Sequence, residues 1–149
     1  ERFVFKIEQL IQKYGVSPKF VELEITEGSM MNVNETFSIL KHLKTLGVFV
    51  SIDDFGTGYS PLSYLKTYPI DIIKIDQSFI ADITKDEKNE AIIKAIILLS
   101  HNLGLEVIAE GVELEAQELF LKTNNCQKVQ GYLYDKPLPV EELVAQYFH

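Results

Sequence analysis

The chain has 149 residues, 46% of them apolar, which is typical of one compact domain and too apolar for a disordered tail. Its 22 acidic and 14 basic residues give a formal net charge of −8, which excludes a protein that tracks DNA or RNA through phosphate contacts. Cys126 is the only cysteine, so an internal disulfide and a cysteine-based zinc cluster are excluded.

Helices and strands are predicted to alternate along the chain. Apolar residues at helical spacing predict a helix over 3–14 that ends at Gly15. Alternation predicts a strand over 21–25, and apolar, β-branched runs predict strands over 48–52, 70–75 and 105–109. A short fifth strand is expected over 128–132. Between and after these strands we expect helices over 37–46, 62–68, 89–103, 114–121 and 139–148. This order predicts an α/β fold with a parallel sheet, either an open doubly wound sheet or a closed (β/α) barrel, in one domain over residues 1–149.

Polar side chains recur at or near the ends of all five predicted strands. Because the carboxyl ends of parallel strands meet at one face, we expect these side chains to lie close together. Their carboxylate and amide oxygens are the ligands that hard divalent cations prefer. The residues are Glu24, Asp53, Asp54, Lys74, Glu110, Glu113 and Gln130.

Each of these residues also has a purely structural interpretation. Asp54 could cap the helix that follows its strand, and Glu110 and Glu113 could favour the start of theirs. Lys74 is harder to explain in this way, because a lysine inside an apolar strand is costly unless it is paired. The agreement of five strand ends favours a functional site.

Five ordered motifs resemble those of EAL domains, bacterial phosphodiesterases that open cyclic di-GMP to linear pGpG. The resemblance runs from about Phe3 to Phe148 and implies a TIM-like (β/α)₈ barrel. Such a barrel typically needs about 250 residues, so this chain is expected to supply about five of the eight units. The motifs are Glu24-Ile25-Thr26-Glu27, Asp53-Asp54-Phe55-Gly56-Thr57-Gly58-Tyr59-Ser60, Lys74-Ile75-Asp76, Ala109-Glu110-Gly111-Val112-Glu113, and Gln130-Gly131-Tyr132 through Lys136-Pro137.

The resemblance implies a role for each matching residue. Lys74 and Glu110 are expected to be catalytic, with Lys74 contacting the attacking water or the charge that develops on the phosphoryl group. Glu113 and Asp54 are expected to contact substrate. Ligands of one or two Mg²⁺ or Mn²⁺ ions would be Glu24, Asp53, Asp54, Glu110 and Gln130. Glu27 would brace a loop that links metal binding to dimerisation and contains Phe55, Gly56, Thr57, Gly58, Tyr59 and Ser60.

The sequence also departs from the family pattern. Pro61 stands where a second serine is usual, and Gln127 stands where an acidic residue is common. The family's Glu-Ala-Leu signature and a metal-binding Asn motif do not occur in residues 1–149, so we expect a partial EAL domain that is inactive or nearly so by itself.

The resemblance predicts a parent protein that is a metal-dependent cyclic di-GMP phosphodiesterase. The alternatives are a degenerate module that binds cyclic di-GMP or a protein partner without catalysis, and a barrel hydrolase acting on another phosphodiester. Open sheet edges would favour a homodimer or a swapped oligomer, and a fused sensor or diguanylate cyclase module is common in the family. No apolar run reaches the roughly 18 residues of a membrane span, so we expect no membrane contact by this segment and a cytoplasmic location.

Overall fold

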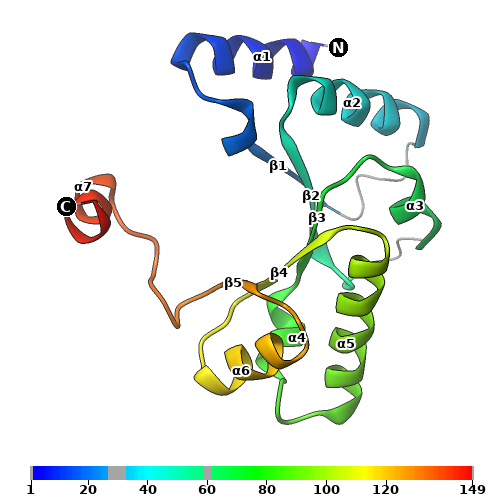
Figure 1. The fold of residues 1–149 in the computed structure, drawn as a ribbon, viewed down its shortest axis with the longest axis vertical. Coiled ribbons are helices and arrows are strands. Elements are labelled where there is room, and N and C mark those ends of the chain that lie inside the picture. Colours follow the sequence, from blue (N-terminus) through cyan, green and yellow to red (C-terminus); the bar gives the residue numbers. More distant parts are fainter. Residues whose placement is uncertain (1, 27–32, 59–61, 149) are drawn as a thin grey trace.

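The computed structural model describes residues 2–26, 33–58 and 62–148, which form one parallel sheet with helices between its strands (Figure 1). The strands are β1 (Glu22–Thr26), β2 (Phe49–Phe55), β3 (Ile72–Ile75), β4 (Glu106–Glu110) and β5 (Lys128–Gln130). They pair in the order β1-β2-β3-β4-β5, and every pairing is parallel. A doubly wound sheet reverses its strand order at a switch point, whereas this sheet adds each strand beside the previous one, as a barrel wall does. Within the described residues the wall is open, because β1 and β5 each pair on one side only.

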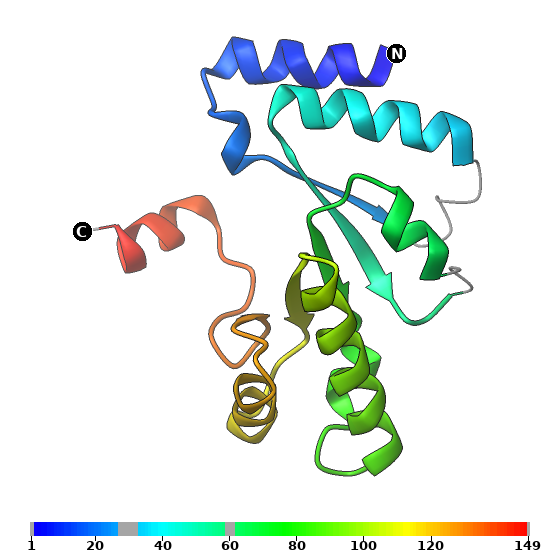
Figure 2. The same cartoon turned by 45° about the vertical axis from the view of Figure 1, so that its right-hand side comes forward.

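The helices are α1 (Arg2–Tyr14), α2 (Val33–Leu46), α3 (Leu62–Thr67), α4 (Gln77–Ala81), α5 (Glu87–Asn102), α6 (Glu115–Thr123) and α7 (Val140–Tyr147), with a short 3₁₀ turn at Pro18–Phe20. Helix α1 lies along α2, and α7 stands apart from the sheet at the end of an extended segment (Figures 1 and 2). The alternation expected from sequence is therefore confirmed, although α4 and the 3₁₀ turn were not predicted. Among the described residues, no helix has the length and apolar character needed to cross a membrane.

The hydrophobic core lies between the sheet and the helices that cover it. Strand β3 contributes Ile73 and Ile75, both fully buried. Side chains alternate along a strand, so Lys74 points to the opposite face of the sheet from these two isoleucines, the face on the inner side of the barrel wall. Other fully buried residues of this core are Leu40, Leu43, Val48, Ile52, Ile80, Ile83, Ile93, Ile97 and Leu121.

An ion pair connects helix α2 to the sheet at the amino-terminal ends of the strands. The ammonium of Lys44 on α2 lies 2.7 Å from both carboxylate oxygens of Asp71, which precedes β3. Asp71 also accepts a hydrogen bond from the backbone N–H of Val50 in β2 at 2.8 Å. One carboxylate thus connects a helix and two adjacent strands at the end opposite the polar residues, where the contact supports the fold.

The loop after β4 passes very close to the end of β5 at Gly131. A Cβ atom at Gly131 would lie 2.1 Å from the carbonyl oxygen and 2.3 Å from the nitrogen of Val112. The Val112 N–H donates to the Gln130 carbonyl at 3.1 Å, and its own carbonyl accepts from the Leu133 N–H at 2.9 Å. Only glycine fits this crossing, which joins the loops after β4 and β5.

We predict that Gly131→Ala lowers the free energy of unfolding by about 3 kcal/mol, because the two backbones must separate to admit a methyl group. Gly104→Ala is the control: Gly104 has φ +73° but nothing within 4 Å of its Cβ position, so only conformational strain of about 1 kcal/mol is expected. Urea unfolding of both variants measures the difference, and equal losses would contradict the close crossing.

Candidate active site at the carboxyl ends of the strands

The centre of the polar cluster is the ammonium of Lys74, whose side chain is only 6% exposed. Its Nζ lies 2.5 Å from Oε1 of Glu24 on β1, 3.2 Å from Oδ1 of Asp53 on β2 and 2.7 Å from Oε1 of Glu110 on β4. Three strands therefore each direct a carboxylate at a lysine on β3. These contacts provide the ion pairs that were expected for a lysine inside an apolar strand.

The charge state of Lys74 follows from these contacts. Burial by itself would lower the pKa of the ammonium, but its contacts with the carboxylates of Glu110, Glu24 and Asp53 outweigh burial and hold the pKa above its ordinary value. Lys74 is therefore protonated at neutral pH and acts as a fixed positive charge and hydrogen-bond donor.

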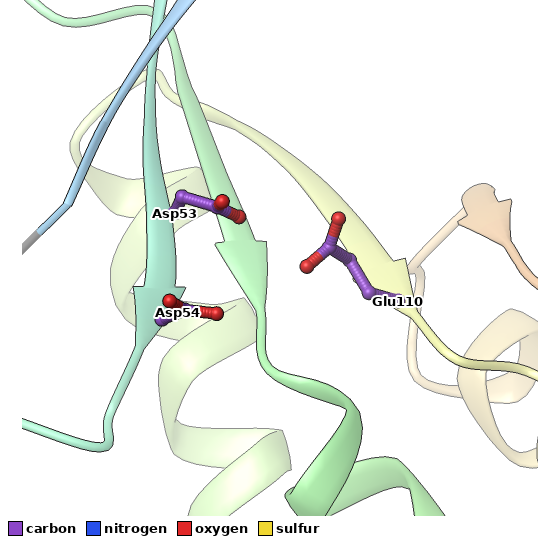
Figure 3. A group of neighbouring side chains, drawn as sticks. All are labelled: Asp53, Asp54 and Glu110. Carbon is purple, nitrogen blue, oxygen red and sulfur yellow. The ribbon is translucent and has the colours of Figure 1, made fainter.

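An irregularity in β2 brings two consecutive aspartates to the same site. The pairing of β2 with β3 shifts register between Ile52 and Phe55, and Asp54 has a φ of +55°, in the left-handed region. In a regular strand Asp53 and Asp54 would point to opposite faces. Here ligand oxygens of Asp53, Asp54 and Glu110 all lie within 4.8 Å of one another. Figure 3 shows the carboxylates of Asp53 and Glu110 facing each other, with Asp54 at the end of β2.

The donor set fits a hard divalent cation. Oδ1 of Asp53 is buried and has no hydrogen-bond partner among the described residues, although it lies 3.2 Å from the Lys74 ammonium. A buried carboxylate oxygen without a hydrogen bond is costly and is satisfied by a cation. Asp54 and Glu110 supply further oxygens, each within 4.8 Å of the others, which is close enough for side-chain adjustment to bring them onto a shared ion.

Two carboxyl groups of the site have raised pKa values. For Asp54 the main cause is repulsion from the neighbouring charge of Asp53, and Asp76 adds to it. For Glu110 the main cause is burial, which outweighs the opposing hydrogen bond from Lys74. The charge of a neighbouring carboxylate therefore dominates at Asp54, and loss of solvent dominates at Glu110.

A cavity of about 280 Å³ adjoins the cluster. Its lining includes the predicted residues Asp54, Glu110, Glu113 and Gln130. Gln130 ends β5 and is paired in register with Glu110, so the ladder itself sets these two side by side. The cavity is also lined by Asp76, Gln77, Gly111, Gly131 and Tyr132.

The predicted site residues thus form two overlapping groups. Glu24, Asp53 and Glu110 meet at Lys74. Glu110 also lines the adjoining cavity, together with Asp54, Glu113 and Gln130. The structural alternatives for two of them are wrong: Asp54 lies inside β2 and Glu110 ends β4, whereas the helices that follow these strands begin farther along the chain, α3 at Leu62 and α6 after its cap Leu114.

Part of the predicted loop lies outside the described residues, namely Glu27, Tyr59 and Ser60. Phe55 is buried in the core, and the Thr57 hydroxyl donates to the Asp54 carbonyl at 2.9 Å. Gly56 has φ +100° and lies against the ring of Phe79, where a Cβ would come within 2.8 Å. Gly58 is exposed in the same segment.

Sequence reasoning did not identify Asp76 and Gln77 as parts of the cavity. Asp76 follows β3 directly and accepts from the Ser78 N–H at 2.9 Å as the cap of α4. The signal available was the Asp-Gln-Ser order after an apolar strand, which is typical of a helix start. Because α4 has five residues, its hydrophobic periodicity was too short to detect.

Comparison with known proteins gives a consistent family. The family model named EAL domain matches residues 1–137. Cyclic di-GMP phosphodiesterase NbdA of Pseudomonas aeruginosa is 45% identical over 141 residues, which cover 94% of this chain and 18% of NbdA. The bifunctional diguanylate cyclase/cyclic di-GMP phosphodiesterase MucR of the same organism is 41% identical over 95% of this chain and 21% of MucR. The chain therefore spans about a fifth of the length of these relatives.

Solved structures support the same relation. The MucR phosphodiesterase in complex with cyclic di-GMP superimposes with a TM-score of 0.89 at 41% identity, covering 94% of this chain and 57% of that one. A manganese and cyclic di-GMP complex of Klebsiella pneumoniae BlrP1 gives a TM-score of 0.83 at 32% identity, over 90% of this chain and 34% of BlrP1. The open sheet therefore corresponds to part of an EAL-type barrel, which confirms the predicted fold class.

We predict that Lys74→Met lowers the free energy of unfolding at neutral pH by about 2–3 kcal/mol. This is below the 3–5 kcal/mol typical of a fully buried pair because Glu24 is half exposed. Without the ammonium, the folded-state pKa of Glu110, already raised by burial, rises further because the hydrogen bond that opposed burial is lost, and this destabilises the fold above the pKa that Glu110 has in the unfolded chain. The loss should shrink as the pH falls toward about 4, where Glu110 becomes protonated.

Lys128→Met is the matched control, because the Lys128–Glu106 pair joins two adjacent strands but has both side chains more than half exposed. It should cost less than about 1 kcal/mol. Urea unfolding between pH 4 and 9 checks both variants. A loss for Lys74→Met that is as small as the control, or independent of pH, would contradict the central role of this ammonium.

Proposed function

The chain belongs to the EAL domain family, and from this we propose that residues 1–149 are part of a domain that hydrolyses cyclic di-GMP to linear pGpG with the help of Mg²⁺ or Mn²⁺. The observation that carries the proposal is the Lys74 ammonium enclosed by Glu24, Asp53 and Glu110, with the buried Oδ1 of Asp53 left without a hydrogen bond among the described residues. A degenerate domain would have no need to retain such a costly cluster.

The charge balance of the site calls for a cation. Three carboxylates contact one ammonium and Asp54 lies beside two of them, so the cluster by itself repels a substrate that carries two negatively charged phosphodiesters. Divalent cations bound there would neutralise this charge, lower the pKa of a coordinated water and stabilise the leaving oxygen. The residues proposed to hold them are Glu24, Asp53, Asp54, Glu110 and Gln130.

The chain's own groups divide the remaining work. Lys74 stays protonated, so it orients the attacking water or stabilises negative charge on the phosphoryl oxygens and does not act as the base. Burial raises the pKa of Glu110 and so brings it closer to neutral pH, where a general base is most effective. We assign Glu110 to accept the proton of the attacking water while one phosphodiester bond opens.

Substrate recognition is assigned to the cavity beside the cluster. Glu113 and Asp54 line it, and a carboxylate can accept hydrogen bonds from the N–H groups on the edge of a guanine base. Tyr132 adds an aromatic side chain, 57% exposed, to the same cavity. A guanine ring could be held there by both kinds of contact.

The proposal extends to association and to fused modules. In the 149-residue chain by itself, the edges of β1 and β5, each paired on one side only among the described residues, would favour a homodimer or a swapped oligomer, and a loop over 55–60 that Glu27 would brace would connect the site to that interface. The relative MucR is named as a bifunctional protein, which supports a fused diguanylate cyclase or sensor module in this protein too.

Release of pGpG by the full-length protein with Mn²⁺ tests the function. We expect Asp53→Asn and Glu110→Gln to reduce kcat by about 10³-fold, the scale of losing a group that acts in the transition state. Glu106→Gln is the control, since Glu106 begins β4 at its exposed end, remote from the site, and should keep wild-type activity. Cyclic di-GMP binding by the wild type without any pGpG release would instead favour the non-catalytic alternative.

The 149-residue chain by itself is expected to turn over at least about 10²-fold more slowly than the full-length protein. The reason is that Glu24 lies on an edge strand and is half exposed, so its carboxylate lacks support on one side, and misplacement by about 1 Å costs that much. Parallel assays at equal molar concentration measure the ratio. Equal turnover numbers for the 149-residue chain and the full-length protein would show that the open edge at β1 does not impair the site.

A further inference from the structure

Gln117 on α6 is a buried polar side chain outside the carboxylate cluster, with 4% of its surface exposed. Its Oε1 accepts the backbone N–H groups of Glu113 and Leu114, each at 2.9 Å. Its Nε2 donates to the carbonyl of Ile80 in α4 at 3.0 Å. Burying an amide is costly unless both ends are hydrogen-bonded, and here both ends are used.

The segment that Gln117 holds is the turn between Glu110 and α6. Gly111 in this turn has φ +69° and lies against Gln77, where a Cβ would come within 2.5 Å. Val112 is held by the backbone bonds to β5 described above. Glu113 and Leu114 follow, and their N–H groups are the two that Gln117 accepts.

The two glutamates of this region therefore have separate supports. Glu110 is fixed by its register with Gln130 and by the Lys74 ammonium, neither of which involves Gln117. The backbone at Glu113 is fixed by Gln117, which in turn is anchored to α4. Helix α4 begins directly after β3, because Asp76 is its cap.

We propose that Gln117 is a positioning residue that sets the affinity for substrate by fixing Glu113 at the cavity, without taking part in the chemical step. This inference rests on the proposed function and deepens it. It assigns the position of Glu113, which binds substrate, and the positions of Lys74 and Glu110, which act in the chemical step, to different contacts.

Steady-state kinetics of the full-length protein with cyclic di-GMP and Mn²⁺ test the inference. In Gln117→Met the volume is kept but the hydrogen bonds are lost. We expect KM to rise about ten- to a hundredfold, the scale of displacing a contact residue by about 1 Å, while kcat stays within about twofold. Ile97→Val is the control: it removes a fully buried methyl from α5 at a cost of about 1 kcal/mol and should leave KM unchanged.

A double-mutant cycle shows whether Gln117 acts through Glu113. In a Glu113→Ala background, Gln117→Met should raise KM by less than about twofold further, since the side chain it positions is already absent. If the Met variant does not fold, Gln117→Asn replaces it, because its amide is one methylene too short to reach both N–H groups. An unchanged KM, a fall in kcat at constant KM, or full additivity in the cycle would overturn the inference.

The test remains informative if the proposed function fails. A wild-type protein that binds cyclic di-GMP without releasing pGpG would refute hydrolysis, and the equilibrium Kd then takes the place of KM. Gln117→Met should weaken that Kd by the same factor, and an unchanged Kd would overturn the positioning role independently.

Discussion

The structure depends above all on one electrostatic constraint: carboxylates from three strands can share a small volume only because the Lys74 ammonium lies among them. Lys74 is placed there by the alternation of β3, in which its neighbours Ile73 and Ile75 are fully buried on the other face. The same contacts keep the ammonium protonated, whereas burial raises the pKa of Glu110 in spite of the hydrogen bond from Lys74. Fold stability and site chemistry are therefore coupled through a single side chain.

A second constraint is the irregularity of β2. It lets Asp53 and Asp54 reach the same site although they are adjacent in sequence, and it returns Phe55 to the core. The irregularity leaves Asp54, which is not a glycine, at a positive φ. This backbone conformation is strained, so the surrounding contacts must hold it in place. Such a departure from regular geometry at a site is what places ligand oxygens within reach of one ion.

The sequence was sufficient to predict the alternating elements and the gathering of Glu24, Asp53, Lys74 and Glu110, because period-two patterns and parallel strand ends constrain both. The choice between an open sheet and a barrel wall could not be made from periodicity, since it depends on which strands pair; the family resemblance indicated the barrel. The positive φ of Asp54 was also not predictable, because aspartate in this position normally indicates a helix cap. Helix α4 was too short to show a period, and the role of Gln117 depends on contacts 37 residues away.

The site thus consists of a rigid cluster set by strand register and a neighbouring turn set by side-chain hydrogen bonds. The central claim is that the cluster around Lys74 holds a divalent cation for phosphodiester hydrolysis. Electron paramagnetic resonance of Mn²⁺ titrated into the full-length protein tests this claim most directly. The account predicts saturable Mn²⁺ binding that persists in Glu106→Gln and is lost or weakened at least about tenfold in Asp53→Asn. Equal Mn²⁺ binding by wild type and Asp53→Asn would contradict it.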